Sequence, residues 1–389
     1  MLRLGAIADD YTGGSDLAGM LAERGARTAM FFGVPDSPLG SEFDAAVVCL
    51  KSRSIPAADA RAMSARALAW LQAQGAQQIQ FKYCSTFDST ARGNIGPVLD
   101  ELLDRLGERL ATAIPALPVN GRTQYCGHLF VNGVPLNESP MRDHPLNPMT
   151  DANLVRHLAA QTPSHVGLVP LGAPVAERCA ELARDGVRMA LVDAITNADL
   201  ASIAEGIASH RLFSGGSGIG AAIADRWALP RTAAMPAPLN APRGTVMIAG
   251  SCSAATLAQL QRYQGAKLHF RDAHSAPHVL RHEGRVLIYS SAPPDQRETA
   301  PGAAADLEHH LAACAVDLRA RRIIVAGGET SGAVVDALGI RAVEILRVLS
   351  PGVPALRTLE PAPRALVLKS GNFGSPDFFT EAAAYLESL

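Results

Sequence analysis

The sequence lacks an excess of positive charge and a long hydrophobic run, and each absence excludes a class of protein. Its 389 residues contain 35 Lys and Arg against 37 Asp and Glu, a formal net charge of −2. Nucleic-acid-binding proteins neutralise phosphates with surplus basic side chains, so this balance excludes that class. No apolar stretch approaches the ~20 residues that cross a bilayer, and Asp9 and Asp10 fall where the apolar segment of a secretory signal would lie. We therefore expect a cytoplasmic protein with no nucleic-acid and no membrane partner.

Metal-binding and common catalytic motifs are also missing. The six cysteines are scattered, without CxxC or short Cys/His spacing, and are expected to be reduced thiols. His274, His278 and His282 recur every four residues, but no further ligands accompany them, so we expect a solvated face and no metal site in the protein. The absence of GxxxxGK[ST], GxSxG and SxxK excludes a P-loop and removes the usual support for a serine hydrolase.

One glycine-rich segment, residues 216–221, fits the loose GxGxxA form of a dinucleotide-binding fingerprint. It follows residues 211–214, which form a poor strand pattern, and it comes late in its domain. We interpret it as a structural turn or a loop on the substrate side, and a nicotinamide-dependent dehydrogenase stays an alternative.

Short Val- and Ile-rich runs alternate with helical patterns along most of the chain. This alternation predicts an α/β fold with two α/β/α domains, mainly parallel sheets and an inter-domain active-site cleft. A Pro-rich segment without periodicity predicts a boundary, which gives domains at 1–230 and 244–389 and a linker at 231–243. Asn132-Gly133 predicts a tight hairpin turn. The clearest predicted strands are 2–8, 28–32, 45–50, 79–82, 165–169, 188–193, 245–249, 267–270, 286–289, 322–326, 343–348 and 365–368.

Polar loops follow three strands of the first domain. Asp9 and Asp10 follow the first strand; such a pair can accept a hydroxyl proton or hold a metal ion, and helix capping explains only part of this loop. Lys51-Ser52-Arg53 follows the third strand, and Lys82 closes the fourth. Because carboxyl ends of parallel strands meet at one sheet edge, these loops predict a site for a carboxylate ligand.

Three loops of the second domain combine glycine with hydroxyl residues. They are Gly250-Ser251-Cys252-Ser253, residues 327–332 (GGETSG) and residues 369–374 (KSGNFG), each placed after a predicted strand. Small residues let a phosphate approach the backbone, and helix starts offer unpaired N–H groups. The three loops together predict a phosphate-binding face for a nucleotide.

These loops resemble the four-carbon acid sugar kinase family from the first strand to the last helix. The resemblance lies in ADDYTGGSD (8–16), FDSTARGNIG (87–96), GSCS (250–253), GGETSG (327–332) and KSGNFG (369–374). It implies a two-domain enzyme that uses ATP to phosphorylate the terminal hydroxyl of a small sugar acid, with the acid in the N-terminal domain and ATP in the C-terminal one. KYCSTFDST (82–90), with residues 120–133 and 138–154, resembles the branch that converts 3-oxo-tetronate to 3-oxo-tetronate 4-phosphate.

Carried over position by position, the resemblance implies two sets of contact residues. Contacts to the sugar acid come from Asp10, Arg53, Lys82, Asp88, Ser89 and Thr90, and contacts to ATP come from Ser253, Gly327, Gly328, Glu329, Thr330 and Gly371. Lys82 and Arg53 are expected to hold the substrate carboxylate, and Asp88 or Asp10 to accept the proton of the C4 hydroxyl. Mg²⁺ is expected to bridge the ATP phosphates, with Glu329 as a candidate metal or water ligand.

Several points stay open at this stage. Gly14 departs from the common ADDFTGA form and is expected to loosen the turn. D-threonate or D-erythronate remains an alternative substrate, and a non-catalytic sugar-acid sensor remains an alternative function. Whether the chain forms a homo-oligomer is likewise undecided.

Overall fold

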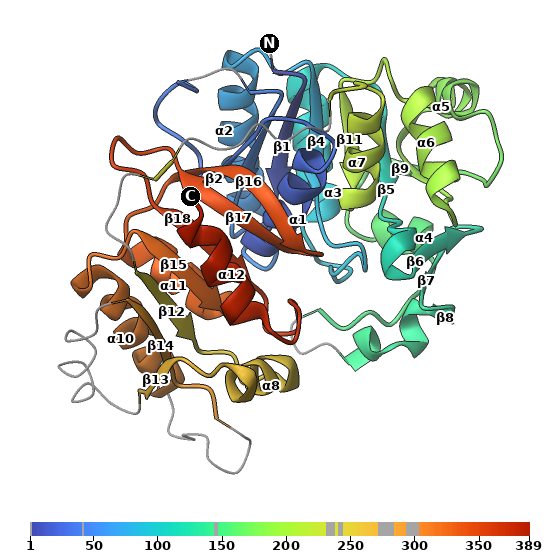
Figure 1. Cartoon of the computed structure of the whole chain (residues 1–389). Helices are drawn as coiled ribbons and strands as arrows, with labels where there is room; N and C mark the ends of the chain where they lie inside the picture. The colour runs from blue at the N-terminus through green and yellow to red at the C-terminus, as the bar shows by residue number, and fades with distance from the viewer. Residues whose placement is uncertain are drawn as a thin grey trace. The chain divides into compact units, whose positions relative to one another are not determined.

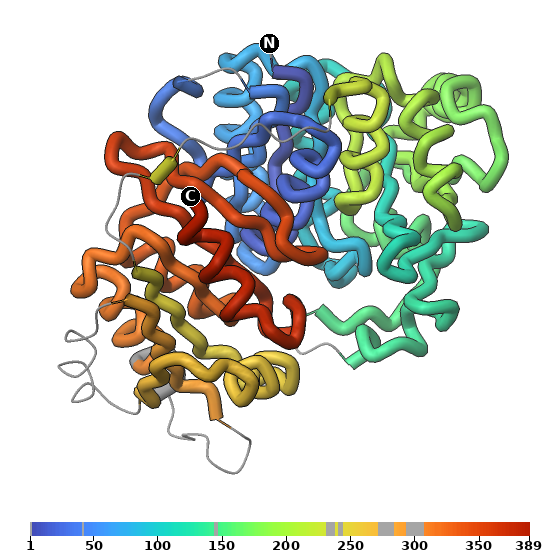
Figure 2. Tube along the Cα trace, in the orientation of Figure 1, coloured from blue at the N-terminus to red at the C-terminus, as the bar shows by residue number. Residues whose placement is uncertain are grey.

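The structure is a computed structural model that describes residues 2–40, 43–143, 147–230, 238–239, 244–270, 284–292 and 303–389, without the side chains of 303–306. The chain divides into two compact units, Met1–Arg231 and Thr232–Leu389, which are followed by colour in Figures 1 and 2. Most of the predicted linker and the three spaced histidines lie outside the described residues.

The described part of the N-terminal unit is built on a parallel sheet of order β2-β3-β1-β4-β11-β5-β10-β9. Helices cover both faces, with α1, α5, α6 and α7 on one and α2, α3 and α4 on the other. This double cover explains why strands such as β1 and β3 are apolar at every position. The strands are β1 Leu4–Ala8, β2 Thr28–Phe32, β3 Ala45–Cys49, β4 Gln78–Lys82, β5 Ala111–Ile114, β9 His165–Val169, β10 Val187–Val192 and β11 Leu212–Gly215. The helices are α1 Tyr11–Ala22, α2 Ala57–Ala73, α3 Ile95–Leu106, α4 Leu154–Ala159, α5 Val175–Arg184, α6 Asn197–Gly206 and α7 Ser217–Asp225.

A small antiparallel sheet accompanies this unit. It consists of β6 Arg122–Tyr125, β7 His128–Val131 and β8 Val134–Pro135, and short 3-10 helices flank it at Pro118–Asn120, Leu136–Glu138 and Pro140–Asp143. Asn132 and Gly133 join β7 to β8 with φ values of 51° and 80°. The hairpin predicted from Asn-Gly is therefore confirmed, because both residues adopt the left-handed conformation that this turn requires.

The described part of the C-terminal unit contains a sheet of order β13-β14-β12-β15-β18-β17-β16, in which β17 alone runs antiparallel to the other strands. Its strands are β12 Thr245–Ala249, β13 Ala266–His269, β14 Arg285–Tyr289, β15 Arg322–Ala326, β16 Ala342–Ser350, β17 Val353–Thr358 and β18 Ala365–Lys369. Its helices are α8 Ala254–Arg262, α10 Ala303–Asp317, α11 Gly328–Ala337 and α12 Phe378–Glu387.

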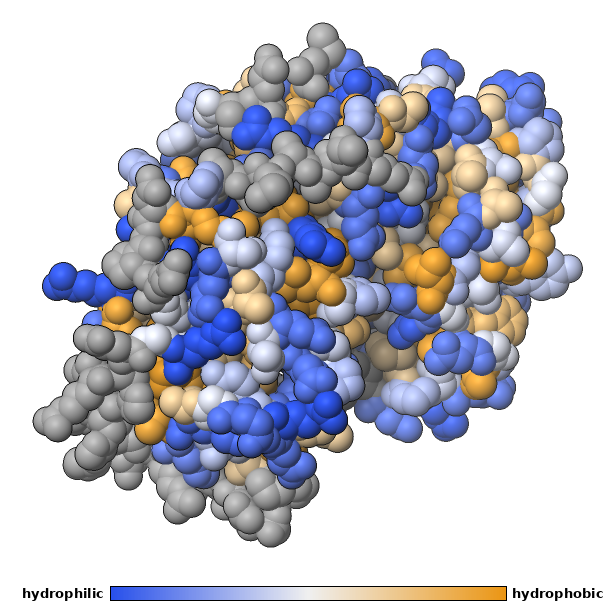
Figure 3. Space-filling model, viewed as in Figure 1, coloured by the Kyte–Doolittle hydropathy of each residue, from blue (hydrophilic) through white to orange (hydrophobic). Residues whose placement is uncertain are grey.

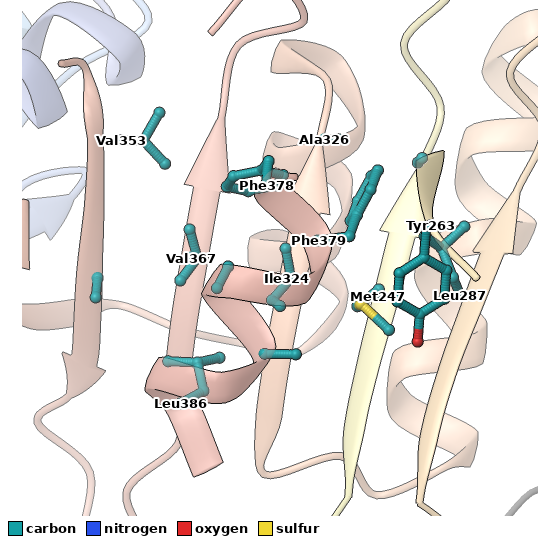
Figure 4. Packing of buried hydrophobic residues seen from close by; sticks show 14 of the residues in the cluster. Met247, Tyr263, Leu287, Ile324, Ala326, Val353, Val367, Phe378, Phe379 and Leu386 are labelled. Atoms are coloured by element: carbon teal, nitrogen blue, oxygen red, sulfur yellow. The ribbon is translucent and has the colours of Figure 1, made fainter. Parts of the chain in front are cut away.

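The core of this unit lies between α12 and the sheet. Phe378 and Phe379 of α12 pack against Met247, Ile324 and Val367 on three neighbouring strands (Figure 4). All of these side chains are buried, so α12 is fixed against the strands whose carboxyl ends carry the glycine-rich loops. The predicted α/β fold with mainly parallel sheets is confirmed.

One strand prediction was wrong. Residues 212–215 form β11, a fully buried strand between β4 and β5 rather than a poor one. Its polar Ser214 is satisfied inside the sheet, where the hydroxyl donates to the Thr112 carbonyl at 2.9 Å and shares a hydrogen bond with the Tyr83 hydroxyl at 3.2 Å. Tertiary packing therefore makes a central strand from a short segment with weak apolar character.

The surface gives a less specific signal. The face drawn in Figure 3 mixes hydrophilic and hydrophobic residues. Exposed large apolar side chains of the described residues come from different elements: Val119, Tyr125, Val134, Ile195, Val316, Leu359 and Phe373. No helix in the described part of the chain has the length and apolar character needed to cross a membrane.

Candidate functional site

The charged loops of the N-terminal unit meet at the carboxyl edge of its sheet. In register, Ala8 of β1 lies beside Cys49 of β3 and Lys82 of β4, so the residues that follow these strands are neighbours. Asp10 caps α1, and its Oδ1 accepts a hydrogen bond from the Gly13 amide at 2.7 Å. The edge thus gathers Asp9, Asp10, Arg53 and Lys82, as the strand pattern predicts.

Arg53 is the centre of this cluster. Its Nε and Nη2 donate to both oxygens of Asp9 at 2.8 and 2.9 Å, Nη2 lies 3.0 Å from Asp10 Oδ2, and Nη1 donates to Asp88 Oδ2 at 3.0 Å. Burial raises the pKa of Asp9, and the paired guanidinium opposes that rise. Burial also works to lower the pKa of Arg53, but the adjacent Asp9 and Asp10 carboxylates outweigh it, so Arg53 stays charged. All three guanidinium nitrogens therefore bind the protein's own carboxylates, and the expected contact of Arg53 with the substrate stays a prediction.

Lys82 occupies a different position in the cluster. Its side chain is buried, and its Nζ donates to the Tyr83 carbonyl at 2.9 Å. A Cβ placed on Gly13 would lie 2.8 Å from Lys82 Nζ and 2.4 Å from Asp10 Oδ1. Glycine at position 13 therefore lets an ammonium and a carboxylate approach each other at the start of α1.

The loop with Asp88, Ser89 and Thr90 is held by residues far away in sequence. His157 of α4 hydrogen-bonds the Ser89 carbonyl through Nε2 at 2.5 Å. Gln161 donates to Ser89 Oγ at 3.0 Å and to the Thr90 carbonyl at 2.7 Å, so the Ser89 hydroxyl is buried and engaged. These anchors lie about seventy residues downstream, and no local motif marks them.

The Asn94 side chain connects the loop after β4 to the segment that carries Arg53. Its side-chain Nδ2 donates at 2.8 Å to the carbonyls of both Ser52 and Ile55, which flank Arg53. Asn94 belongs to the segment FDSTARGNIG (87–96), and the sequence alone indicates no role for it. The amide fixes the backbone from which Arg53 reaches the three carboxylates.

Gly14 has a packing role that the sequence did not indicate. A Cβ at this position would lie 2.2 Å from the Cys49 Sγ, which is fully buried at the end of β3. Burial also raises the pKa of the Cys49 thiol, so the thiol stays neutral. Glycine at 14 thus accommodates a cysteine on the neighbouring strand.

Two of the three glycine-rich loops in the C-terminal unit are bonded to each other. Ser253 caps α8 by accepting from the Thr256 amide, and its hydroxyl donates to the Gly371 carbonyl at 2.6 Å. Thr256 Oγ1 donates to the same carbonyl at 2.9 Å. The loops at 250–253 and 369–374 are therefore hydrogen-bonded to each other through the Gly371 carbonyl.

The third loop begins α11. Gly327 adopts φ 134°, and no side chain caps this helix among the described residues, so the first amides of α11 are available to an anion. A Cβ on Gly328 would meet nothing within 4 Å, and Glu329 is exposed. Thr330, in contrast, is buried, and its hydroxyl donates to Glu308 of α10 at 3.1 Å. Its side chain therefore anchors the loop to the protein interior.

The glycine-rich segment at 216–221 serves packing. A Cβ on Gly216 or Gly218 would lie 2.8 Å from a backbone carbonyl, and one on Gly220 would lie 2.4 Å from Gln80 Oε1. The Ser217 hydroxyl donates to Asp16, which ties α7 to α1. The protein's own contacts therefore account for the three glycines and the serine of this segment.

Comparisons with known proteins agree with this division. A family model described as "Sugar-binding N-terminal domain" matches residues 4–223, and one described as "Nucleotide-binding C-terminal domain" matches residues 246–379. A 3-oxo-tetronate kinase of Burkholderia multivorans is 48% identical over 99% of this chain and 97% of its own. One of Cupriavidus necator is 47% identical over 98% of this chain and 97% of its own.

Solved structures support the same assignment. The crystal structure of a Haemophilus influenzae protein is 41% identical and superposes with a TM-score of 0.87, covering 98% of this chain and all of that one. The resemblance seen in the motifs is confirmed. The chain belongs to the family that joins a sugar-binding N-terminal domain to a nucleotide-binding C-terminal domain, the family of the 3-oxo-tetronate kinases.

Proposed function

We propose that the protein is an ATP-dependent kinase that transfers a phosphoryl group to the C4 hydroxyl of 3-oxo-tetronate and forms 3-oxo-tetronate 4-phosphate. The observation that carries this proposal is the 48% identity to a 3-oxo-tetronate kinase over nearly the whole of both chains. Phosphoryl transfer needs little covalent chemistry from a protein; it needs a positioned acceptor and neutralised phosphate charge. The cluster of acidic and basic side chains in the N-terminal unit is suited to position the acceptor. The glycine-rich loops of the C-terminal unit are suited to bind the phosphates.

In the sugar-acid site, we assign the substrate carboxylate to Lys82. Within the described part of the chain, its hydrogen bond to the Tyr83 carbonyl uses one ammonium hydrogen, which leaves two for a ligand. Arg53 is assigned a positioning role, because it holds Asp9, Asp10 and Asp88 together. We also assign Ser89 and Thr90 to the sugar-acid site. Because the Ser89 hydroxyl is bonded to Gln161, Ser89 would contact the substrate through its backbone.

Asp10 is the better candidate for the general base. The side chain of Asp10 is 31% exposed, whereas that of Asp88 is 9% exposed. A base must come within hydrogen-bond reach of the hydroxyl whose proton it accepts, and the more accessible carboxylate meets that condition. Asp88 then keeps the Arg53 guanidinium in place.

In the nucleotide site, the amides at the start of α11 are assigned to the phosphates. Gly328 leaves the space that a phosphate needs, and Gly327 and Gly371 shape the turns around it. The Ser253 hydroxyl holds the Gly371 loop, and the Thr330 side chain anchors the α11 loop to Glu308. No group of three or more His, Cys, Asp or Glu side chains in the described residues is placed to hold a metal ion. Mg²⁺ is therefore expected to arrive with the ATP phosphates, where it supplies charge neutralisation.

A coupled ADP-release assay tests the proposal across 3-oxo-tetronate, D-threonate, D-erythronate and L-threonate. We expect the largest kcat/KM for 3-oxo-tetronate. A preference for a threonate or erythronate would overturn the substrate assignment but keep the kinase reaction. Binding of the acid without any ADP release would support the sugar-acid sensor instead.

A further inference from the structure

Lys369, the last residue of β18, places a buried ammonium against the glycine-rich loop at 369–374 and the start of α8. Its side chain is 2% exposed, and its Nζ donates to Thr256 Oγ1 at 2.9 Å, to the Gly371 carbonyl at 3.0 Å and to the Ser370 carbonyl at 3.3 Å. The ring of Phe378 lies 5.4 Å from the ammonium. Every one of these contacts is with an uncharged group.

No carboxylate of the described residues forms an ion pair with this ammonium. Acidic side chains at α12 are engaged elsewhere, Asp377 with Arg262, Glu387 with Arg285 and Glu381 with the Ser375 hydroxyl. The other charged or titratable groups on the elements around Lys369 are Arg322 of β15, Arg357 of β17, Tyr385 of α12, and Glu329 and Asp336 of α11. Burial is the cause that shifts the pKa of Lys369, lowering it to about 8.

A buried ammonium without a counter-ion is costly, because the neutral groups around it replace only part of its hydration. The cost falls when an anion comes close. The Gly371 carbonyl accepts from Lys369, Ser253 and Thr256, so the ammonium lies where two of the three glycine-rich loops of the proposed nucleotide site meet. In a trans peptide the carbonyl and the following N–H point in opposite directions. Holding the Gly371 carbonyl therefore turns the Asn372 amide away from Lys369, and Asn372 is an exposed residue.

We infer that Lys369 is a positioning residue of the nucleotide site: its ammonium holds the Gly371 peptide and is the buried counter-charge for the nucleotide phosphates. This inference rests on the proposed function, because it takes the glycine-rich loops as the ATP site. Lys369 acts through the loop backbone and through its charge, and its three hydrogen bonds to the protein stay in place.

A proton linkage follows from this role. Because burial lowers the pKa of Lys369 to about 8, a fraction of the Lys369 side chains is neutral at pH 8 in the free protein. Phosphates nearby favour the charged form and raise that pKa, so binding at pH 8 takes up a fraction of a proton per nucleotide. Affinity is full below pH 8 and falls as the pH rises through this value. The nucleotide adds little to the signal, since its last phosphate ionisation lies near pH ~6.

Calorimetry of ADP with Mg²⁺ at pH 8, in two buffers of different ionisation enthalpy, measures both affinity and proton uptake. We expect Lys369→Met to weaken ADP binding about 10- to 100-fold, as loss of a poorly screened charge near a phosphate should, and to abolish the uptake. Lys369→Arg should keep most of the affinity and also lose the uptake, because arginine does not titrate. Lys267→Met removes an exposed lysine of the same unit and should match the wild type.

Circular dichroism melting checks that each variant folds. A folded Lys369→Met protein with wild-type affinity and uptake would overturn the inference. So would Lys369→Arg with unchanged uptake, which would place the titrating group elsewhere. These outcomes do not involve the sugar acid, so they are separate from a failure of 3-oxo-tetronate phosphorylation. Failure of the wild type to bind ADP would refute this inference and the nucleotide-site assignment together.

Discussion

Replacing Gly14 with alanine should destabilise the N-terminal unit, and removing the Cys49 thiol should cancel the effect. The new Cβ would lie 2.2 Å from Cys49 Sγ, far inside contact distance, and the thiol is buried with little freedom to move. Overpacking of this kind costs about 1–3 kcal/mol. Alanine in the first turn of α1 also gains roughly 0.5–1 kcal/mol over glycine. Subtracting this gain from the cost leaves an expected net loss for Gly14→Ala of roughly 0–2.5 kcal/mol, centred on about 1 kcal/mol.

In a Cys49→Ala background the balance changes. The nearest neighbours of the added methyl are then the Ala8 Cβ at 3.2 Å and the Cβ of residue 49 at 3.4 Å, which need shifts of only a few tenths of an ångström. Gly14→Ala should therefore become nearly neutral or slightly stabilising. The coupling energy between the two positions is expected to be about 1–3 kcal/mol.

Urea unfolding followed by tryptophan fluorescence measures these energies in the intact chain. Both tryptophans, Trp70 and Trp227, belong to the N-terminal unit, so the signal reports that unit. Gly40→Ala is the matched control, since a Cβ there would meet nothing within 4 Å. If the effects of Gly14→Ala and Cys49→Ala simply add within about 0.5 kcal/mol, the steric explanation is wrong.

Three further predictions concern activity. Lys82→Met should raise the KM for the sugar acid about 10- to 100-fold, the value of a lost charged hydrogen bond, with the KM for ATP unchanged; equal losses for both substrates would contradict the assignment. Asp10→Asn keeps an oxygen that can cap α1 but should lower kcat by about 10²–10⁴, with a smaller loss for Asp88→Asn; tenfold losses in both variants would mean that neither is the base. Gly328→Val should fold normally, since a Cβ there meets no atom within 4 Å, yet lose nucleotide binding in calorimetry; unchanged affinity would remove this loop from the site.

Much of the architecture could be predicted from apolar runs and turn residues. The segments 28–32, 165–169, 245–249 and 322–326 coincide with β2, β9, β12 and β15. Strands covered by helices on both faces are continuous apolar runs, and this pattern is visible without any tertiary information. The parallel order also predicts that loops after neighbouring strands converge, which is why Asp10, Arg53 and Lys82 were expected together.

Tertiary structure decided how those residues pair. The contacts of about 3 Å that join Arg53 to three carboxylates come from tertiary packing, whereas a strand pattern specifies only the edge where the groups meet. The anchors of the Ser89 loop come from α4 and from Gln161 just after it, far along the chain, and no local pattern links them to the loop. Tertiary packing also buries Lys369 and places Cys49 in the space that Gly14 leaves. Local sequence determines where a strand ends and which charges follow it; only close packing determines which charge remains for a ligand.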